Sequence, residues 1–256
     1  DTPLGIAAAL GFATVAIDLR GTGCSGGSFD LWEEVQALDG FDAVQALAAQ
    51  PWVRNGRVGM VGVGDAADTM VGVAALDPPG LAAIAPIGVF DDAYRSVIRP
   101  GGVPNATAIE QIRAIEDSAA DGTSWARARI ADGDERCARN QALRGQTVRR
   151  ADELARLAHA PGGDRPFGLS FEPAVLAREV KVPTFLVTTW QDERAGGHGS
   201  VLVPALGGSD QAYVTLMNGN QDQSLAVPTV LQHWYEFLAL YVAREAPHPE
   251  RAWALA

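Results

Sequence analysis

The chain has 256 residues, of which 47% are hydrophobic and 20% charged, and its formal net charge is −11. This length suffices for one large α/β domain with a sizeable core, whereas an acidic chain with scattered basic residues is unlike a nucleic-acid binder. No apolar run reaches the length of a membrane span. No cluster of Cys and His suggests zinc, so we expect neither a metal nor a cofactor. The chain begins with Asp1 and shows no signal-peptide pattern, so we expect a processed, trimmed or partial chain.

The first hundred residues alternate between helical and strand patterns. A Gly-Pro-rich stop at residues 77–80 separates the last two of these elements. In chain order we expect a helix ending near Leu10, a strand at Phe12–Ile17, a helix at Leu31–Ala49 weakened by Asp39-Gly40, a strand at Val58–Val63, a helix at Asp65–Leu76 and a strand at Leu81–Ile87.

The pattern changes between Asn105 and Pro173, where no strand is apparent. Strand signals return afterwards, and an amphipathic helix closes the chain. We expect short helices at Ile109–Ile115, Trp125–Ile130, Cys137–Leu143 and Val148–Ala158, strands at Thr184–Thr189 and Tyr213–Met217, and a helix at Pro228–Ala243.

Apolar strands that alternate with helices predict an α/β fold with a doubly wound, mostly parallel sheet. The helical stretch then divides the core in two. We expect a first part of the core over residues 1–104, a helical insertion over 105–174 and a second part of the core over 175–256.

The segment from Val58 to Ala67 carries the clearest chemical signal. An apolar strand runs into a turn of small residues and then into a helix, which is the frame of a nucleophile elbow with the motif G-x-S-x-G. Here Gly64 stands in the serine position and Ala66 in that of the last glycine. Since glycine has no side chain, nothing at this position can attack a carbonyl carbon. Residues 62–67 also fit the dinucleotide-binding motif G-x-G-x-x-A, but the acidic residue that this motif requires about 20 positions later is missing.

Further motifs, taken together, resemble the X-Pro dipeptidyl-peptidase and cocaine-esterase-like family of α/β-hydrolases. The resemblance runs nearly end to end, and the block from Arg20 to Gly102 is its most specific part. The motifs are Asp18 and Arg20 before Gly21–Gly27, Asp39-Gly40, Pro51-Trp52-Val53, Gly56–Met60, Ala83–Pro86, Asp91–Arg95, Val182–Thr184, Trp190–Glu193 and Asn218–Gln221.

This resemblance implies a Ser-His-Asp hydrolase that cleaves X-Pro peptide bonds or esters through an acyl-enzyme. It places the triad acid at Asp192 and the triad base at Gln221, a side chain that cannot accept a proton near neutral pH. One oxyanion donor would be the backbone N–H of Asp65, whose carboxylate would repel a developing oxyanion. The insertion at 105–174 would be the cap over the site; a surface excursion without a ligand is the alternative. The family's early strands and its C-terminal jelly roll are not expected in this chain.

Five further residues are candidates for the lining of a pocket. Asp91, Asp92 and Tyr94 leave the third strand toward the insertion, and an ion-paired hinge is the alternative role for them. Trp190 and His198 flank the loop of the triad acid. His198 could act as a substitute base or form part of the loop wall.

We therefore expect an α/β-hydrolase-fold chain with a broken triad that is inactive or very weak. Its partner, if any, would be a small acyl or peptide ligand. The alternatives are a non-catalytic binding or interaction protein and a decayed fragment on the same scaffold.

Two cysteines, Cys24 and Cys137, leave a further choice open. They are either two buried or half-exposed thiols, or one disulfide that ties the Arg20–Gly27 loop to the helical region; the resembled family carries Cys in both contexts. The compartment stays undetermined from the sequence, and a secreted protein is favoured only if the disulfide forms.

Overall fold

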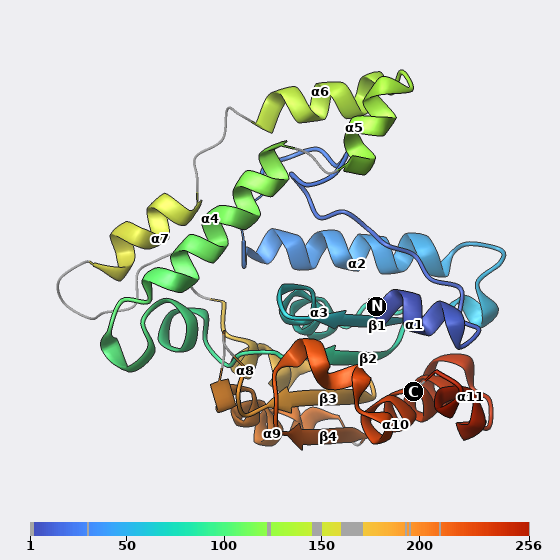
Figure 1. Cartoon of the computed structure of the whole chain (residues 1–256). Helices are drawn as coiled ribbons and strands as arrows, with labels where there is room; N and C mark the ends of the chain where they lie inside the picture. The colour runs from blue at the N-terminus through green and yellow to red at the C-terminus, as the bar shows by residue number, and fades with distance from the viewer. Residues whose placement is uncertain are drawn as a thin grey trace. The chain divides into compact units, whose positions relative to one another are not determined.

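A computed structural model describes residues 3–29, 31–121, 124–144, 150–159, 171–192, 194, 196–209 and 211–255. The chain forms two compact units (Figure 1). The first comprises Asp1–Val15, Gly40–Asp92 and Glu172–Ala256, and the second comprises Ala16–Asp39 and Ala93–Phe171. We describe each unit by itself.

A four-stranded parallel sheet forms the centre of the first unit. Its strands follow one another in chain order, β1-β2-β3-β4, and Val63, Ile87, Val187 and Thr215 lie in one row across it. All four strands lie where the apolar pattern predicts them. The strands are β1 (Val58–Val63), β2 (Leu81–Ile87), β3 (Thr184–Thr189) and β4 (Ala212–Met217).

Helices pack on both faces of this sheet. On one face, Trp234 of α10 is completely buried in a cluster with Phe185 of β3, Ala85 of β2 and residues of α1 and α11. The alternate residues of β2 point to the opposite face, where α3 packs on β1 and β2. The helices of the first unit are α1 (Pro3–Ala9), α2 (Glu34–Ala48) from Gly40 onward, α3 (Asp65–Ala75), α8 (Pro173–Leu176), α9 (Leu202–Ala205), α10 (Pro228–Leu238) and α11 (Pro249–Trp253).

Short helical turns complete the unit and join its elements. They are η1 (Arg54–Gly56), η4 (Ala177–Glu179), η5 (Gly196–Val201), η6 (Leu206–Gly208), η7 (Gln221–Ala226) and η8 (Ala239–Ala243). No helix in the part of the chain that the structure describes is both long and apolar enough to cross a membrane.

Gly40 explains why an Asp-Gly pair stands inside α2. A Cβ on Gly40 would lie 2.3 Å from Cγ2 of Val73, which is completely buried on α3. The two helices approach so closely that only glycine fits at this point. Gly40, which weakens the helical pattern in the sequence, is therefore required by packing, and α2 continues through this position.

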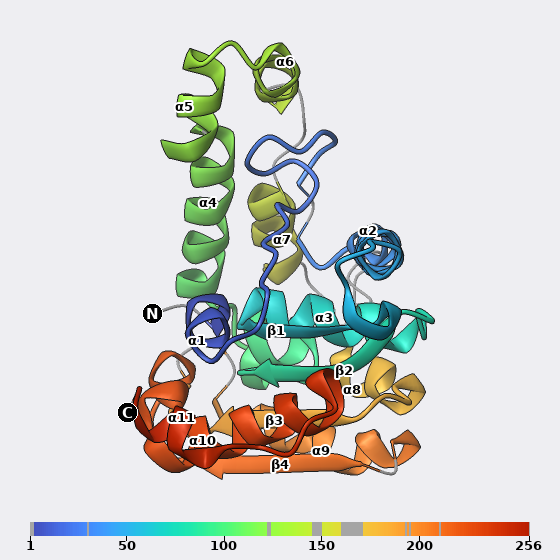
Figure 2. The ribbon, with the colours of Figure 1, turned by 90° about the vertical axis from the view of Figure 1, so that its right-hand side faces the viewer.

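The prediction of a strand at Phe12–Ile17 is wrong. The segment is extended but forms no ladder, and the side chains of Val15 and Ile17 are 43% and 55% exposed. Among the described residues β1 pairs only with β2, and α1 packs next to β1 (Figure 2). An extended segment becomes a strand only when another strand pairs with its N–H and C=O groups, and none does so here.

The second unit is helical, as the sequence predicts for this region. Helices α4 and α7 pack together, and Oε1 of Glu116 accepts a hydrogen bond from the N–H of Ala151 at 2.9 Å. The predicted start of α7 at Val148 lies outside the described residues, and the role of residues 105–174 as a cap stays a prediction. The unit contains η2 (Ala93–Ile98), η3 (Pro100–Gly102), α4 (Ala106–Asp121), α5 (Ser124–Ala131), α6 (Glu135–Arg144) and α7 (Arg150–Ala158).

A disulfide joins Cys24 to Cys137, with the two Cα atoms 4.6 Å apart. It ties the loop at residues 20–27 to α6. Hydrogen bonds add to this link, since Asn140 Nδ2 donates to the carbonyl of Cys24 at 2.9 Å and Gln141 Nε2 donates to that of Gly23 at 2.8 Å. Of the two alternatives left open by the sequence, the structure contains the disulfide.

Candidate functional site

The turn between β1 and α3 has the geometry of an elbow. Gly64 has φ = 63° and ψ = −126°, a conformation that L side chains rarely adopt. Its N–H donates to the carbonyl of Ile87 at 2.9 Å, and its carbonyl accepts from the N–H of Asp68 at 3.0 Å. A Cβ on Gly62 would lie 3.0 Å from the Cβ of Ala66, so the turn also requires small flanking residues. The strained turn of the motif is present, and no side chain projects from it.

Gln221 lies next to this turn, at the start of η7 after β4. A Cβ on Gly64 would lie 3.4 Å from both Nε2 and Oε1 of Gln221. The side chain also packs against Gly88, where a Cβ would lie 2.1 Å from Oε1. This oxygen is buried and has no hydrogen-bond partner among the described residues. The residue in the base position therefore faces the residue in the nucleophile position.

Asp192 follows β3 at the same edge of the sheet and is 7% exposed. Its Oδ1 accepts a hydrogen bond from the N–H of Arg194 at 3.0 Å. The loops that carry Asp192 and Gln221 are joined, because Gln191 exchanges two hydrogen bonds with Gly219, at 2.5 Å and 3.2 Å. The three positions of the resembled triad thus follow three strands at one sheet edge, where parallel α/β proteins place their ligand sites. Their roles stay predictions.

The sequence reasoning missed Arg194. Its guanidinium forms ion pairs with Asp65, at 3.0 Å, and with Asp68, and it donates to the carbonyl of Gly88 at 2.5 Å. It also lies 5.0 Å from the ring centre of Phe90. The signal in the sequence was the acidic pair Asp65 and Asp68, three residues apart on the first turn of α3. Asp68 is buried, and a buried carboxylate requires a nearby cation. Since Arg194 balances the carboxylate of Asp65, the repulsion expected beside the oxyanion donor is reduced.

Burial governs the charge of this cluster. The side chain of Asp68 is fully buried, and this raises its pKa to about 7 although Arg194 opposes the shift. Burial would lower the pKa of Arg194, but the charges of Asp68 and Asp65 outweigh it and raise that pKa. The guanidinium therefore stays charged while Asp68 titrates near neutral pH.

The candidate pocket residues are only partly brought together. Nδ1 of His198 lies 3.4 Å from Oδ1 of Asp91, and Trp190, which is half exposed, packs its ring against Gly197. Asp92 is buried in the same unit. Tyr94 is buried in the second unit. In the described part of the chain, no group of three or more Cys, His, Asp or Glu side chains could hold a metal ion.

The comparisons with known proteins agree with this architecture. The sequence model of the X-Pro dipeptidyl-peptidase (S15) family matches residues 3–222. No curated protein is similar enough in sequence to count as a match. Among solved structures, a CocE/NonD family hydrolase from Staphylococcus aureus is 22% identical with a TM-score of 0.67, and an aminopeptidase from a marine sediment archaeon, a Thaumarchaeota archaeon, is 16% identical with a TM-score of 0.62.

These similarities extend over nearly the whole of this chain. The comparison with the staphylococcal hydrolase covers 91% of this chain and 37% of that one, and the comparison with the archaeal aminopeptidase covers 90% and 43%. The α/β-hydrolase GrgF from Penicillium sp. is 17% identical, with a TM-score of 0.52 and coverage of 88% and 78%. At such identities the structures show a shared α/β-hydrolase fold. The family match over residues 3–222 shows more: the chain belongs to the X-Pro dipeptidyl-peptidase (S15) family.

Proposed function

We propose that this chain keeps the scaffold of its family but has lost the serine chemistry, so that it hydrolyses peptides and esters through an acyl-enzyme very weakly or not at all. The observation that carries the proposal is Gly64, which occupies the elbow at φ = 63° without a side chain. A nucleophilic side chain must form a bond to the acyl carbon, and glycine has no side chain that could do so. Small acyl or peptide ligands would bind poorly at this edge of the sheet.

Gln221 supports the same proposal. A serine hydroxyl becomes a nucleophile when a neighbouring base takes its proton, and an amide cannot do so. The amide faces Gly64 directly, so the base position is occupied by a group with no basic function. Two of the three triad roles are therefore vacant, and the retained acid Asp192 has no imidazole to orient.

One observation favours a second candidate, a weak hydrolase that uses general-base catalysis. The carboxylate of Asp91 lies 3.4 Å from Nδ1 of His198, which is the arrangement that holds an imidazole in one orientation. Such a histidine would take a proton from water as the water attacks an ester carbonyl. A purely non-catalytic binding protein is the third alternative, and it differs from the second by the absence of turnover that depends on His198.

The test combines a fluorophosphonate probe with turnover of p-nitrophenyl acetate and an X-Pro p-nitroanilide. We expect no labelling of the parent chain, and hydrolysis near the buffer rate. The double variant Gly64→Ser with Gln221→His serves as the positive comparison, and we expect it to be labelled weakly. Stoichiometric labelling of the parent at any serine would refute the proposal. Ester turnover without labelling, lost in His198→Ala, would instead support the general-base candidate.

A further inference from the structure

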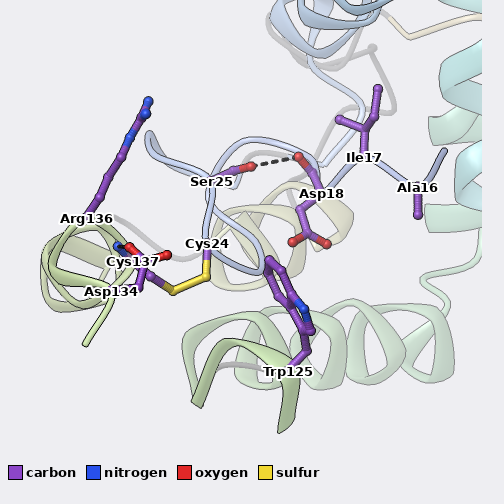
Figure 3. Close-up of a pocket in the computed structure, with 9 residues that line it drawn as sticks. All are labelled: Ala16, Ile17, Asp18, Cys24, Ser25, Trp125, Asp134, Arg136 and Cys137. Atoms are coloured by element: carbon purple, nitrogen blue, oxygen red, sulfur yellow. Dashed lines mark hydrogen bonds between the residues drawn. A yellow bond between two sulfur atoms is a disulfide. The ribbon is translucent and has the colours of Figure 1, made fainter. Parts of the chain in front are cut away.

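A shallow, open cavity of about 380 Å³ lies within the second unit (Figure 3), whereas the elbow belongs to the first unit. Its size is at the small end of ligand sites in proteins. Its walls come from the extended segment before the disulfide loop, from the loop itself, and from α5 and α6. The lining residues that matter for the argument are Ile17, Asp18, Cys24, Trp125, Asp134 and Arg136.

Three of the side chains that line this cavity carry a charge, and two of them are directed elsewhere. The carboxylate of Asp134 is already engaged, since it pairs with Arg129 at 2.9 Å and accepts the N–H of Cys137 at 2.9 Å. The guanidinium of Arg136 points away from the other lining residues (Figure 3). Asp18 is therefore the ionic group that the cavity offers to a ligand.

The position of Asp18 is defined by the loop around it. Its carboxylate lies on Gly23, where a Cβ would come within 1.7 Å of Oδ2, and its carbonyl accepts the hydroxyl of Ser25 at 2.9 Å. Arg144 lies close enough to interact with the charge of Asp18, while its Nη2 donates to the carbonyls of Gly23 and Ser25 at 2.5 Å and 3.1 Å. The charge of Arg144 therefore partly offsets the negative charge of Asp18. Because its guanidinium is held by these carbonyls, Arg144 does not occupy the cavity.

An indole ring lies near this carboxylate in the lining of the cavity (Figure 3). Trp125, at the start of α5, is 55% exposed, and its ring points toward Asp18 in the close-up (Figure 3). Ile17, also 55% exposed, lines the outer part of the cavity, and its side chain points away from the Asp18 carboxylate (Figure 3). A carboxylate near an exposed indole suits an organic cation, and a guanidinium suits it best, since it is planar, weakly hydrated and able both to pair with a carboxylate and to stack on an aromatic ring. The net charge of −11 further favours cations.

We propose that this cavity binds the guanidinium group of an arginine side chain, paired with Asp18 and in contact with the indole of Trp125. The proposal is independent of the elbow and of the proposed loss of hydrolysis. The partner is either a small arginine-like molecule or an arginine of a polypeptide, because both present the same group.

Calorimetric titration of the full chain, with its disulfide intact, tests the proposal with N-acetyl-arginine methylamide as the probe. The neutral analogue N-acetyl-citrulline methylamide keeps the planar shape, but a carbonyl oxygen replaces one NH2 group, so that the charge and one donor group are lost. We expect millimolar binding of the arginine compound, and binding of the citrulline compound that is weaker by about two- to fivefold, as for an exposed ion pair. A blocked Ala-Arg-Ala peptide distinguishes the two sources: tighter binding than the monomer indicates a polypeptide partner, and equal binding indicates a small molecule.

Variants locate the site. Trp125→Leu should weaken binding of the arginine compound by about two- to fivefold, the range of an exposed cation–π contact, and Asp18→Asn by about as much. Matched controls are Trp52→Leu and Asp132→Asn, which change an exposed tryptophan and an exposed aspartate outside the cavity and should leave binding unchanged.

Two results would contradict the proposal. Equal binding of the citrulline and arginine compounds, or unchanged binding in Trp125→Leu, would overturn the proposal. Since Asp18 also supports the disulfide loop, its variant could disturb the fold, and circular dichroism checks this. If Asp18→Asn is unfolded, Trp125→Leu and the neutral analogue still decide the question.

Discussion

The side-chain amide of Gln221 faces the α-carbon of Gly64, so that a Cβ on Gly64 would lie 3.4 Å from both Nε2 and Oε1. The two residues that the family resemblance places at the nucleophile and base positions are therefore neighbours. The amide oxygen is buried without a hydrogen-bond partner among the described residues. A hydroxyl introduced at position 64 would lie within reach of it.

This contact predicts different effects for two substitutions of Gly64. Gly64→Ala imposes a side chain on a backbone with φ = 63° and ψ = −126°, which costs about 1–3 kcal/mol of the free energy of unfolding. Gly64→Ser carries the same strain, but its hydroxyl can donate to Oε1 of Gln221 and recover about 1 kcal/mol. Urea unfolding should therefore rank the parent above the serine variant and the serine variant above the alanine variant. Equal stabilities of the two variants would show that the hydroxyl does not reach Gln221.

The close approach of α2 and α3 makes a second prediction. Gly40→Ala should increase helix propensity by about 1 kcal/mol, yet we expect it to destabilise the chain by about 1–3 kcal/mol, because the new Cβ would lie 2.3 Å from Val73 Cγ2. Val73→Ala removes the clashing methyl groups. In a double-mutant cycle measured by urea unfolding, Gly40→Ala should be tolerated much better in the Val73→Ala background. Additive effects would mean that the helices do not meet at Gly40.

The buried carboxyl of Asp68 makes the third prediction, which concerns pH. Burial raises its pKa from 3.8 to about 7, so between these values the folded chain binds a proton that the unfolded chain does not. The contribution of Asp68 to the free energy of unfolding is then fully present below about pH 4 and is lost as the pH rises to about 7.

Comparison with Asp68→Asn isolates this contribution from the other acidic groups. We expect the stability of the parent relative to the variant to fall as the pH is raised from 4 to 7, and to stay constant above that range. Urea unfolding at a series of pH values measures the difference. A relative stability that increases with pH would mean that the pairing with Arg194 outweighs burial and lowers the pKa of Asp68.

The disulfide makes the fourth prediction. It closes a loop with a sequence separation of 113 residues, and loss of such a bond typically costs about 2–4 kcal/mol. In Cys24→Ser with Cys137→Ser, we expect faster hydrogen exchange at the N–H of Gly21, which donates to Gly26 within the loop. Amides of β2 in the first unit should exchange as in the parent. Unchanged exchange at Gly21 would show that the hydrogen bonds from Asn140 and Gln141 hold the loop without the disulfide.

The sequence by itself determined the four strands of the sheet and the elbow. Val58–Val63 is a short apolar run, Thr184–Thr189 is a short run of apolar and β-branched residues, and the small residues around Gly64 permit a tight turn. Such signals are local, because each depends on residues adjacent in the chain. The absence of a side chain at position 64 is likewise visible in the sequence without any structure.

Only the tertiary structure decided which groups meet across the chain. Phe12–Ile17 has the pattern of a strand but pairs with no strand among the described residues. Gly40 weakens the helical pattern in the sequence, yet it allows α2 to pack on Val73. Arg194 lies far along the chain from Asp65, and Cys24 lies far from Cys137, yet each pair is in contact. Hydrogen-bond ladders, close packing and ion pairs depend on partners distant in sequence, and no periodicity within one segment specifies them.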